Sequence, residues 1–375
     1  MTENTSHSGD ALARISDAGV SVWLDDLSRG ELQDGTLASL VAERHVVGVT
    51  TNPTIFAKAV SEGNAYDAQL GELSASGTTV DDAVLQVTTD DVRTACDLFA
   101  PVYEATGGQD GRVSIEVDPR LAHDTEGTIA AASWLWRTVD RPNVMIKIPA
   151  TPEGLPAITE AIGAGISVNV TLIFSLDRYR AVAQAYVDGL EHAASQGIDL
   201  STIRSVASLF LSRIDAKVDP ALDEIGTEEA AALRGTAAVA NARLAYEIHQ
   251  EVFATPRFAS LEGAHPQRPL WASTGTKDPA YPDTKYVDEL VTAGVVNTMP
   301  RATLEAVADH SEATGADVVQ GSYDQAREQL DTITRIGVPF EQILADLETA
   351  GVASFEKSWA ELLDTVSDGL RGQVD

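Results

Sequence analysis

Eight short apolar stretches, mostly separated by segments of helical periodicity, constrain the fold of this sequence more than any other feature. Stretches of this length and composition are typical of buried strands in a parallel sheet. Repeated strand–helix units predict an α/β fold, and eight of them predict a closed (β/α)8 TIM barrel, with a doubly wound open sheet as the alternative. The expected strands span residues 20–25, 46–52, 112–118, 143–149, 166–174, 203–211, 269–274 and 295–299.

The segments around these stretches set the expected domain organisation. No linker rich in proline, glycine or serine divides the chain, so we expect one barrel domain over residues 19–375, with additional C-terminal helices packed across the barrel or over its mouth. The polar residues 1–18 are expected to form a flexible N-terminal arm. The expected helices span residues 28–42, a long and mostly helical insertion from 53 to 104, and then 126–138, 153–162, 176–194, 230–252, 283–292, 302–310, 324–336 and 339–370.

Composition limits the possible partners and compartments. The net charge of −31 at pH 7 argues against nucleic acid, whereas a few local cations would suffice for a small phosphorylated ligand. The single cysteine, Cys96, excludes an internal disulfide and a cysteine-based zinc site, and its helical surroundings predict a core position. The sequence contains neither an apolar run of the roughly 18 residues that a membrane span needs nor a secretory signal pattern, so we expect a cytoplasmic protein with no membrane partner.

One lysine interrupts the fourth apolar stretch. Lys147 stands between Ile146 and Ile148, and none of the other five lysines lies in the middle of an apolar strand pattern. Desolvation lowers the pKa of a buried lysine, and an uncharged amine attacks carbonyl groups to form Schiff bases. The alternative is a structural lysine that extends to solvent or pairs with a carboxylate.

Polar residues on the other strands favour the chemical alternative. A (β/α)8 barrel keeps its reactive groups at the C-terminal ends of its strands, where side chains two residues apart share a face. A lysine, two acids and two amides on successive strands resemble a Schiff-base site more than a hydrogen-bonded core network. The candidate site residues are Asp25, Thr50, Thr51, Asn52, Glu116, Lys147, Asn169, Thr171, Ser208, Phe210, Arg213, Ser273 and Lys277.

Signatures of other chemistries are missing from the sequence. The seven histidines show no HExxH or HxH spacing, so we expect no metal site. There is no GxxxxGK[ST] motif, and the glycine-rich loop at residues 106–111 does not follow a strand and open a helix as a dinucleotide-binding loop does. There is no GxSxG nucleophile elbow either.

Seven motifs, taken in order, resemble those of transaldolases. They are VWLDDLSRG, GVTTNPTIF, VSIEVDPRL, MIKIPAT, ISVNVTLIFS, SLFLSRID and LWASTGTK, and the resemblance extends from about Val20 to the C-terminal helices. The chain length and the WASTGTK form are most similar to the longer bacterial transaldolases found in actinobacteria. The resemblance implies a barrel of the class I aldolase type, with no metal and no organic cofactor.

The resemblance also implies a reaction and sugar-phosphate substrates. A dihydroxyacetone unit would pass from sedoheptulose 7-phosphate to glyceraldehyde 3-phosphate, giving erythrose 4-phosphate and fructose 6-phosphate in the non-oxidative pentose phosphate pathway. Lys147 matches the Schiff-base lysine, and Asp25 matches the acid that accepts the proton of the donor's C4 hydroxyl. Glu116 and Thr171 match the pair that moves protons through a catalytic water. The matching substrate-binding residues are Asn52, Asn169 and Ser208 for the dihydroxyacetone unit and Arg213, Ser273 and Lys277 for the phosphate, to which we add Thr50 beside Asn52, and Phe210 as a water-excluding ring.

One departure from the family pattern concerns the phosphate site. Other transaldolases carry an arginine close after the serine that Ser273 matches, whereas the nearest cation here is Lys277, which is a point charge and not a bidentate fork. Two other functions stay open: a Schiff-base aldolase that releases free dihydroxyacetone from fructose 6-phosphate, and a non-catalytic sugar-phosphate-binding barrel. A metal-dependent barrel hydrolase is disfavoured because the sequence contains no ligand cluster. Both a monomer and a homodimer are compatible with the sequence.

Overall fold

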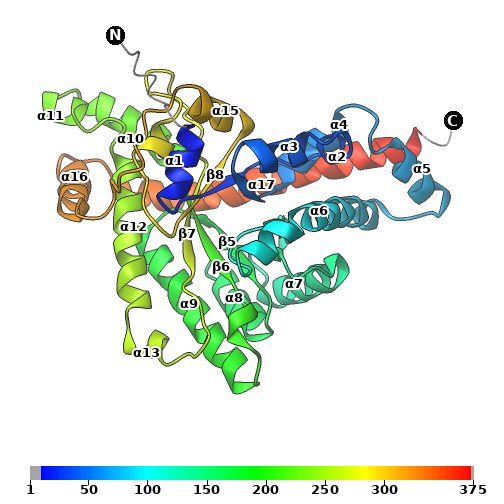
Figure 1. The fold of residues 1–375 in the computed structure, drawn as a ribbon. Helices are drawn as coiled ribbons and strands as arrows, with labels where there is room; N and C mark the ends of the chain where they lie inside the picture. The colour runs from blue at the N-terminus through cyan, green and yellow to red at the C-terminus, as the bar shows by residue number, and fades with distance from the viewer. Residues whose placement is uncertain (1–9, 373–375) are drawn as a thin grey trace, which may run out of the picture.

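Eight parallel strands close into a barrel in sequence order in the computed structural model, which describes residues 10–372 (Figure 1). The closed order confirms the (β/α)8 barrel and excludes the open sheet. All strand residues are buried except Val47, which is partly exposed. The strands are β1 Ser21–Leu24, β2 Val46–Val49, β3 Arg112–Glu116, β4 Val144–Pro149, β5 Val168–Ile173, β6 Ser205–Phe210, β7 Arg268–Ala272 and β8 Val296–Met299.

The register of the barrel collects polar side chains from neighbouring strands at one level. Glu116 of β3 pairs with Lys147 of β4, and Lys147 pairs with Asn169 of β5. All pairings are parallel, so the carboxyl ends of the eight strands meet at one end of the barrel. This end carries the candidate site.

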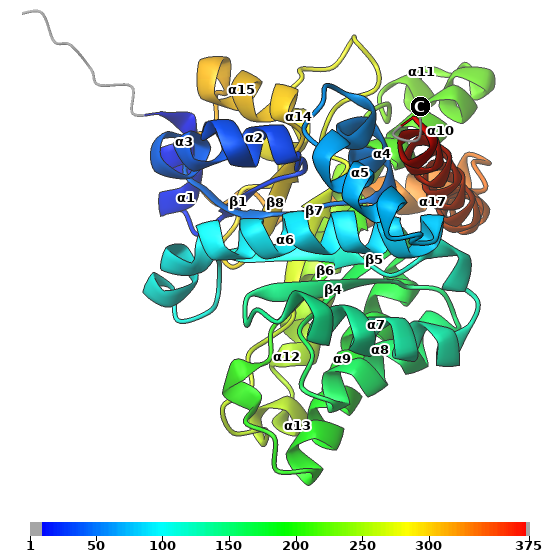
Figure 2. The same cartoon turned by 90° about the vertical axis from the view of Figure 1, so that its right-hand side faces the viewer.

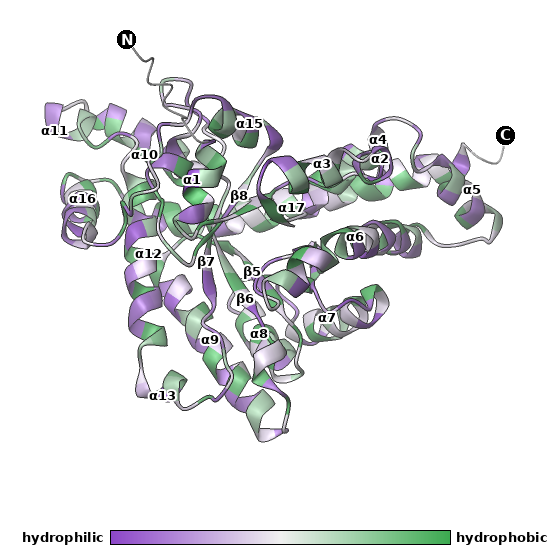
Figure 3. Cartoon of the chain, in the orientation of Figure 1, coloured by the Kyte–Doolittle hydropathy of each residue, from purple (hydrophilic) through white to green (hydrophobic). Residues whose placement is uncertain are grey.

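The helices surround the barrel and mix hydrophobic and hydrophilic residues along their length, as Figure 3 shows. Among residues 10–372, no helix combines the length and the apolar character that crossing a membrane requires. The helices are α1 Ala11–Asp17, α2 Arg29–Asp34, α3 Thr36–Glu43, α4 Pro53–Ser61, α5 Asp67–Ala75, α6 Val80–Ala105, α7 Thr125–Val139, α8 Gly154–Gly163, α9 Leu176–Ser195, α10 Ser212–Ile225, α11 Glu228–Ala231, α12 Ala237–Phe253, α13 Pro256–Ala259, α14 Lys285–Asp288, α15 Arg301–His310, α16 Tyr323–Arg335 and α17 Phe340–Arg371, with short 3-10 turns at Pro119–Leu121 and Leu200–Thr202.

The N-terminal segment differs from the expected flexible arm. The Asp10 side chain caps α1 by accepting a hydrogen bond from the backbone of Leu12. Ala11, Leu12 and Ile15 are buried in the common core, and α1 packs against β1 and α15. The expectation of a flexible arm is therefore wrong for residues 10–18, because one apolar face of the helix contributes to the core. Residues 1–9 lie outside the described part of the chain.

Three helical segments also differ from the sequence expectation. The helix expected over 28–42 is two helices, because Gly35 adopts a left-handed conformation (φ 84°) between α2 and α3. The helix expected over 230–252 is likewise divided into α11 and α12. The segment 283–292 contains only the single turn of α14.

Helix α10 has no counterpart in the sequence prediction. Pro220 lies in its interior, where a proline normally breaks a helix at a cost of roughly 3 kcal/mol. The helix continues because Ile214, Val218 and Leu222, spaced by four residues, are all buried. This helix begins at Ser212, one residue before the candidate phosphate ligand Arg213.

The C-terminal helix α17 closes over the barrel mouth, as expected for the terminal helices. It packs against α4, α5, α6 and α10, and it touches β5 (Figures 1 and 2). Gly351 allows this close approach, because a Cβ at that position would lie 3.0 Å from Leu172 of β5. The helix also brings Phe355 to the wall of the candidate site.

Gly48 makes room for a large ring inside the barrel. A Cβ at Gly48 would lie 2.6 Å from the ring of Trp23, which is fully buried on the neighbouring strand. We expect Gly48→Ala to destabilise the protein by about 1–3 kcal/mol through overpacking, measured by denaturant unfolding. Gly30→Ala on α2 is the matched control, because its nearest neighbour would be 3.9 Å away and it should stabilise slightly. Equal stabilities of the two variants would contradict this packing argument.

Candidate active site

Lys147 lies in the barrel interior, as the sequence predicts. Its side chain is 5% exposed, and its Nζ donates a hydrogen bond to the backbone oxygen of Thr51 at 3.0 Å. The same nitrogen lies 3.7 Å from Glu116 Oε2, which makes an ion pair without a direct hydrogen bond. The ring of Phe355 covers it with its centroid 5.7 Å away. A carbonyl, a carboxylate and a ring therefore fix the position of the amine.

Glu116 is a buried acid with unusual proton affinity. Burial raises the pKa of its carboxyl to about 7, while the Lys147 charge lowers it and the Asp25 charge raises it. Neither of its oxygens has a hydrogen-bond partner within residues 10–372, and the same is true of the buried Thr171 hydroxyl. Buried polar atoms without protein partners are rare and mark sites where another group binds or protons are exchanged. A carboxyl with a pKa near 7 can serve as acid or base at neutral pH.

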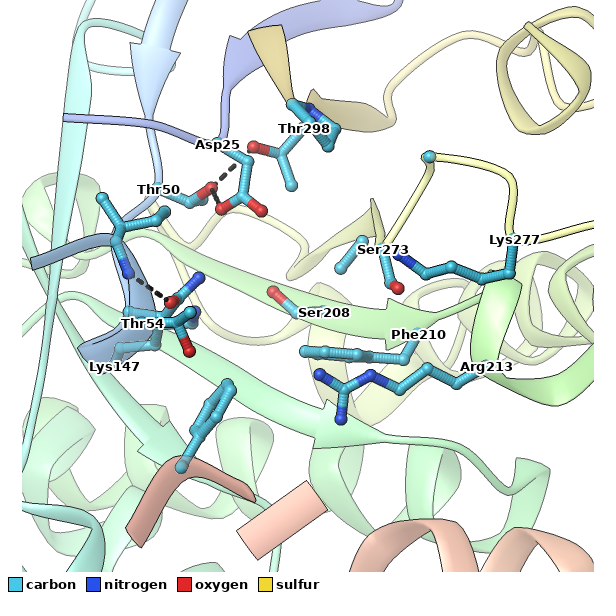
Figure 4. A pocket seen from close by; sticks show the side chains of 16 residues that line it. Asp25, Thr50, Thr54, Lys147, Ser208, Phe210, Arg213, Ser273, Lys277 and Thr298 are labelled. Atoms are coloured by element: carbon cyan, nitrogen blue, oxygen red, sulfur yellow. Dashed lines mark hydrogen bonds between the residues drawn. The ribbon is translucent and has the colours of Figure 1, made fainter. Parts of the chain in front are cut away.

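Asp25 lies at the end of β1 and accepts a hydrogen bond from Thr50 Oγ1 at 2.7 Å. The Thr50 hydroxyl in turn lies 2.6 Å from the hydroxyl of Thr298 at the end of β8, as the dashed lines in Figure 4 show. Burial raises the pKa of Asp25, and the Lys147 charge lowers it. Two threonine hydroxyls thus orient this carboxylate toward the cavity.

The amides of the site lie in two layers. Asn52 lines the cavity, and its side-chain oxygen caps α4 by accepting from the Ile55 backbone at 3.1 Å. Asn169 is fully buried behind the cavity wall. It accepts from the Ser208 hydroxyl at 2.7 Å and donates to Ser114 Oγ at 3.0 Å. Asn169 therefore positions Ser208, which itself lines the cavity.

A positively charged end lies opposite Lys147 in the cavity (Figure 4). Arg213 stacks its guanidinium on Phe210, 5.4 Å from the ring centroid, and burial lowers its pKa. Within residues 10–372, the side chains of Arg213 and Lys277 form neither an ion pair nor a hydrogen bond. Ser273 lies beside them with a left-handed backbone (φ 54°) and its hydroxyl 2.9 Å from that of Ser212. Two cations without carboxylate partners, in a chain of net charge −31, suit a dianionic group.

The cavity between these ends has a volume of about 260 Å³. The sequence analysis did not identify some of the residues that line this cavity. Thr298 lies near the end of β8 and Pro300 directly follows that strand, where the strand-end rule could have found them, whereas Thr54, Gly275 and Phe355 carry no local signal. Among residues 10–372, no three His, Cys, Asp or Glu side chains are grouped as metal ligands would be. The lining residues are Asp25, Thr50, Asn52, Thr54, Ile55, Lys147, Ser208, Phe210, Arg213, Ala272, Ser273, Gly275, Lys277, Thr298, Pro300 and Phe355.

The barrel, the buried lysine beside a carboxyl and the cationic cavity end together define a class I, lysine-dependent aldolase type of barrel. The chain belongs to the Transaldolase/Fructose-6-phosphate aldolase family, whose model matches residues 22–366. This finding confirms the resemblance seen in the sequence motifs.

Individual relatives match nearly the whole chain. This chain is 60% identical over 370 residues to Transaldolase 1 of Streptomyces avermitilis, and the match covers 98% of both proteins. It is 61% identical over 364 residues to a Transaldolase of Thermobifida fusca, covering 96% of this chain and 99% of the relative. A Transaldolase of Mycolicibacterium smegmatis is 59% identical over 366 residues, with 97% of each covered.

The raised pKa of Glu116 makes stability depend on pH. The carboxyl binds its proton more tightly in the folded state (pKa about 7) than at its ordinary value of 4.5, so its contribution to stability is full below 4.5 and is lost as pH rises through 7. We expect the unfolding free energy of the wild type to fall, relative to Glu116→Gln, by on the order of 3 kcal/mol across this window. Denaturant unfolding at a series of pH values measures the difference. The exposed Glu356→Gln on α17 is the control, and parallel curves for Glu116→Gln and wild type would contradict the assignment.

Proposed function

We propose that this protein is a transaldolase that transfers a dihydroxyacetone unit from sedoheptulose 7-phosphate to glyceraldehyde 3-phosphate through a Schiff base on Lys147. The observation that carries the proposal is the Lys147 amine, buried 3.7 Å from Glu116 in a cavity whose other end holds two cations, neither of which has a carboxylate partner among the described residues. Relatives named transaldolase at about 60% identity support it. The cytoplasmic location, the choice between monomer and homodimer, and the absence of a nucleic acid partner stay predictions.

The first chemical step forms the Schiff base. The Lys147 amine adds to the C2 ketone of the donor and gives a carbinolamine. Glu116 donates a proton to the departing C2 hydroxyl, which leaves as water, and the iminium forms. The Glu116 carboxyl, whose pKa is about 7, can give and recover this proton at neutral pH. Thr171 lies on β5, next to the strand of Lys147, and its buried hydroxyl, which has no hydrogen-bond partner among the described residues, completes the proton path.

The second step breaks the C3–C4 bond. Asp25 accepts the proton of the C4 hydroxyl, the C3–C4 electron pair moves toward the iminium nitrogen, and an aldehyde leaves. A positioned general base contributes typically ~10²–10⁴-fold to such a step. The Thr50 hydrogen bond at 2.7 Å holds the Asp25 carboxylate in place for it.

The enamine left on Lys147 then waits for the acceptor aldehyde. Asn52 and Ser208 line the cavity and can hold the hydroxyl groups of the three-carbon unit, with Asn169 fixing Ser208 from behind. Phe210 and Phe355 exclude water from the walls. Keeping protons from the enamine carbon favours transfer over release, which distinguishes a transaldolase from an aldolase.

Lys147 is directly testable. We expect borohydride reduction in the presence of fructose 6-phosphate to leave a stable adduct on Lys147, detected by peptide mass spectrometry, and Lys147→Ala to lower turnover by roughly a thousandfold or more. Lys277→Ala and Lys285→Ala should still form the adduct, because both variants keep the Lys147 amine. An adduct on either of these lysines in the wild type would contradict the proposal.

An assay without acceptor distinguishes a transaldolase from the fructose 6-phosphate aldolase that the family also contains. Wild-type protein with fructose 6-phosphate and no acceptor should release little dihydroxyacetone, and addition of erythrose 4-phosphate should start turnover. Continuous release of dihydroxyacetone without an acceptor would instead identify an aldolase. Substrate binding without any turnover would identify a sugar-phosphate-binding barrel.

The phosphate site predicts unequal effects of its two cations. Arg213→Gln should lower kcat/KM for fructose 6-phosphate by roughly a hundredfold, since a guanidinium can form two charge-assisted hydrogen bonds, and Lys277→Gln by roughly tenfold. Reaction of unphosphorylated fructose should change little in either variant. Steady-state kinetics give kcat/KM for both sugars. If a variant loses as much kcat/KM with fructose as with fructose 6-phosphate, the substitution acts on the structure and not on phosphate binding.

A further inference from the structure

A second cavity lies at the opposite, N-terminal end of the barrel. Its volume is about 210 Å³, and it is formed where β4, β6 and β7 begin. No carboxylate lines it. Its lining residues are Gln109, Met145, Arg204, Ser205, Val206, His249, His265, Pro266, Arg268 and Gly294.

The charge around this cavity is positive. Among the described residues, the Arg204 guanidinium donates hydrogen bonds only to backbone oxygens, those of Ser201, Ile203 and Gly107, and no carboxylate pairs with it. Arg268 pairs with Asp110 at 3.0 Å, which neutralises one charge. The buried Arg112 nearby is likewise held by uncharged oxygen atoms and has no carboxylate partner among residues 10–372. Of these three guanidinium groups, two of which line the cavity, only that of Arg268 has a carboxylate partner among the described residues, although the chain has a large excess of acids.

Two imidazoles complete the cavity wall. His249 has a buried Nδ1 with no hydrogen-bond partner in the described part of the chain. Burial lowers its pKa to about 4, whereas the backbone of Gln267 raises it and the Arg268 charge lowers it by a smaller amount. Burial also lowers the pKa of His265, and the charges of Arg204 and Arg112 lower it further. Burial is therefore the largest cause of both lowered pKa values, and the charges of neighbouring guanidinium groups add to it.

We propose that this cavity binds a small phosphate monoester, with the dianion on Arg204 and His265 and the ester carbons against Met145, Val206 and Pro266. Arg204 can offer its Nε–H, which has no partner among the described residues, and a guanidinium pairs well with phosphate oxygens. The unpartnered Nδ1 of His249 can bond a hydroxyl of the ligand. The proposal does not depend on the reaction proposed for Lys147, because the two cavities lie at opposite ends of the strands.

The test follows the histidine ring signals by NMR while inorganic phosphate is added. The protein carries Arg213→Gln, so that phosphate binding beside Lys147 does not contribute. We expect saturable shifts of the His249 and His265 signals, assigned with His249→Gln and His265→Gln. Adding Arg204→Gln should weaken binding by roughly tenfold or more, whereas Arg137→Gln, an exposed arginine on α7, should leave it unchanged.

Several outcomes would overturn the proposal. They are the absence of saturable shifts, the same shifts with sodium chloride at equal ionic strength, or an unchanged affinity in Arg204→Gln. If Arg204→Gln fails to fold after losing its backbone contacts, His265→Gln replaces it, because the described residues form no hydrogen bond with that ring. Unchanged affinity in His265→Gln would then refute the site. Glycerol 3-phosphate should bind at least as tightly as phosphate, and weaker binding would refute the ester assignment.

Discussion

The Lys147 amine and the Glu116 carboxyl face each other across neighbouring strands inside the barrel, and the rest of the site is arranged around this pair. Removing two ionisable groups from water costs more than their attraction at 3.7 Å returns, so the pair does not stabilise the fold. Its consequence is chemical: burial raises the pKa of Glu116 to about 7, and a proton can then move at neutral pH. The barrel tolerates this pair because strand pairing on both sides holds the backbone in place.

The charged side chains are distributed unevenly along the cavity that contains Lys147. Asp25 and Glu116 lie at the reactive end, and Arg213 and Lys277 lie at the other end without carboxylate partners among the described residues. A substrate with a ketone at one end and a phosphate at the other is complementary to this arrangement. In a chain of net charge −31, such local cations also attract anions into a surface that otherwise repels them.

Much of the fold and of the candidate site could be predicted from the sequence, because apolar stretches and residue alternation are local patterns. The eight apolar stretches specify strands, and the alternation of Asn169 and Thr171 with valines and leucine specifies which residues share a face. Lys147 is conspicuous because an ionisable residue within an apolar run cannot be solvated there. Parallel strand pairing then brings such residues together at one end of the barrel, which is why the sequence alone predicts the candidate site.

The sequence by itself determined the barrel, the position of the lysine on the fourth strand and the polar residues at the ends of the neighbouring strands. Only the tertiary structure decided that Asn169 stands behind Ser208, that α10 persists through Pro220, that α1 belongs to the core, and that Phe355 covers Lys147. The physical reason is the sequence separation of the interacting residues. Periodicity and residue type act over a few positions, whereas the approach of α17 to β4 joins residues far apart in sequence. That approach depends on the packing of whole helices, which no local pattern encodes.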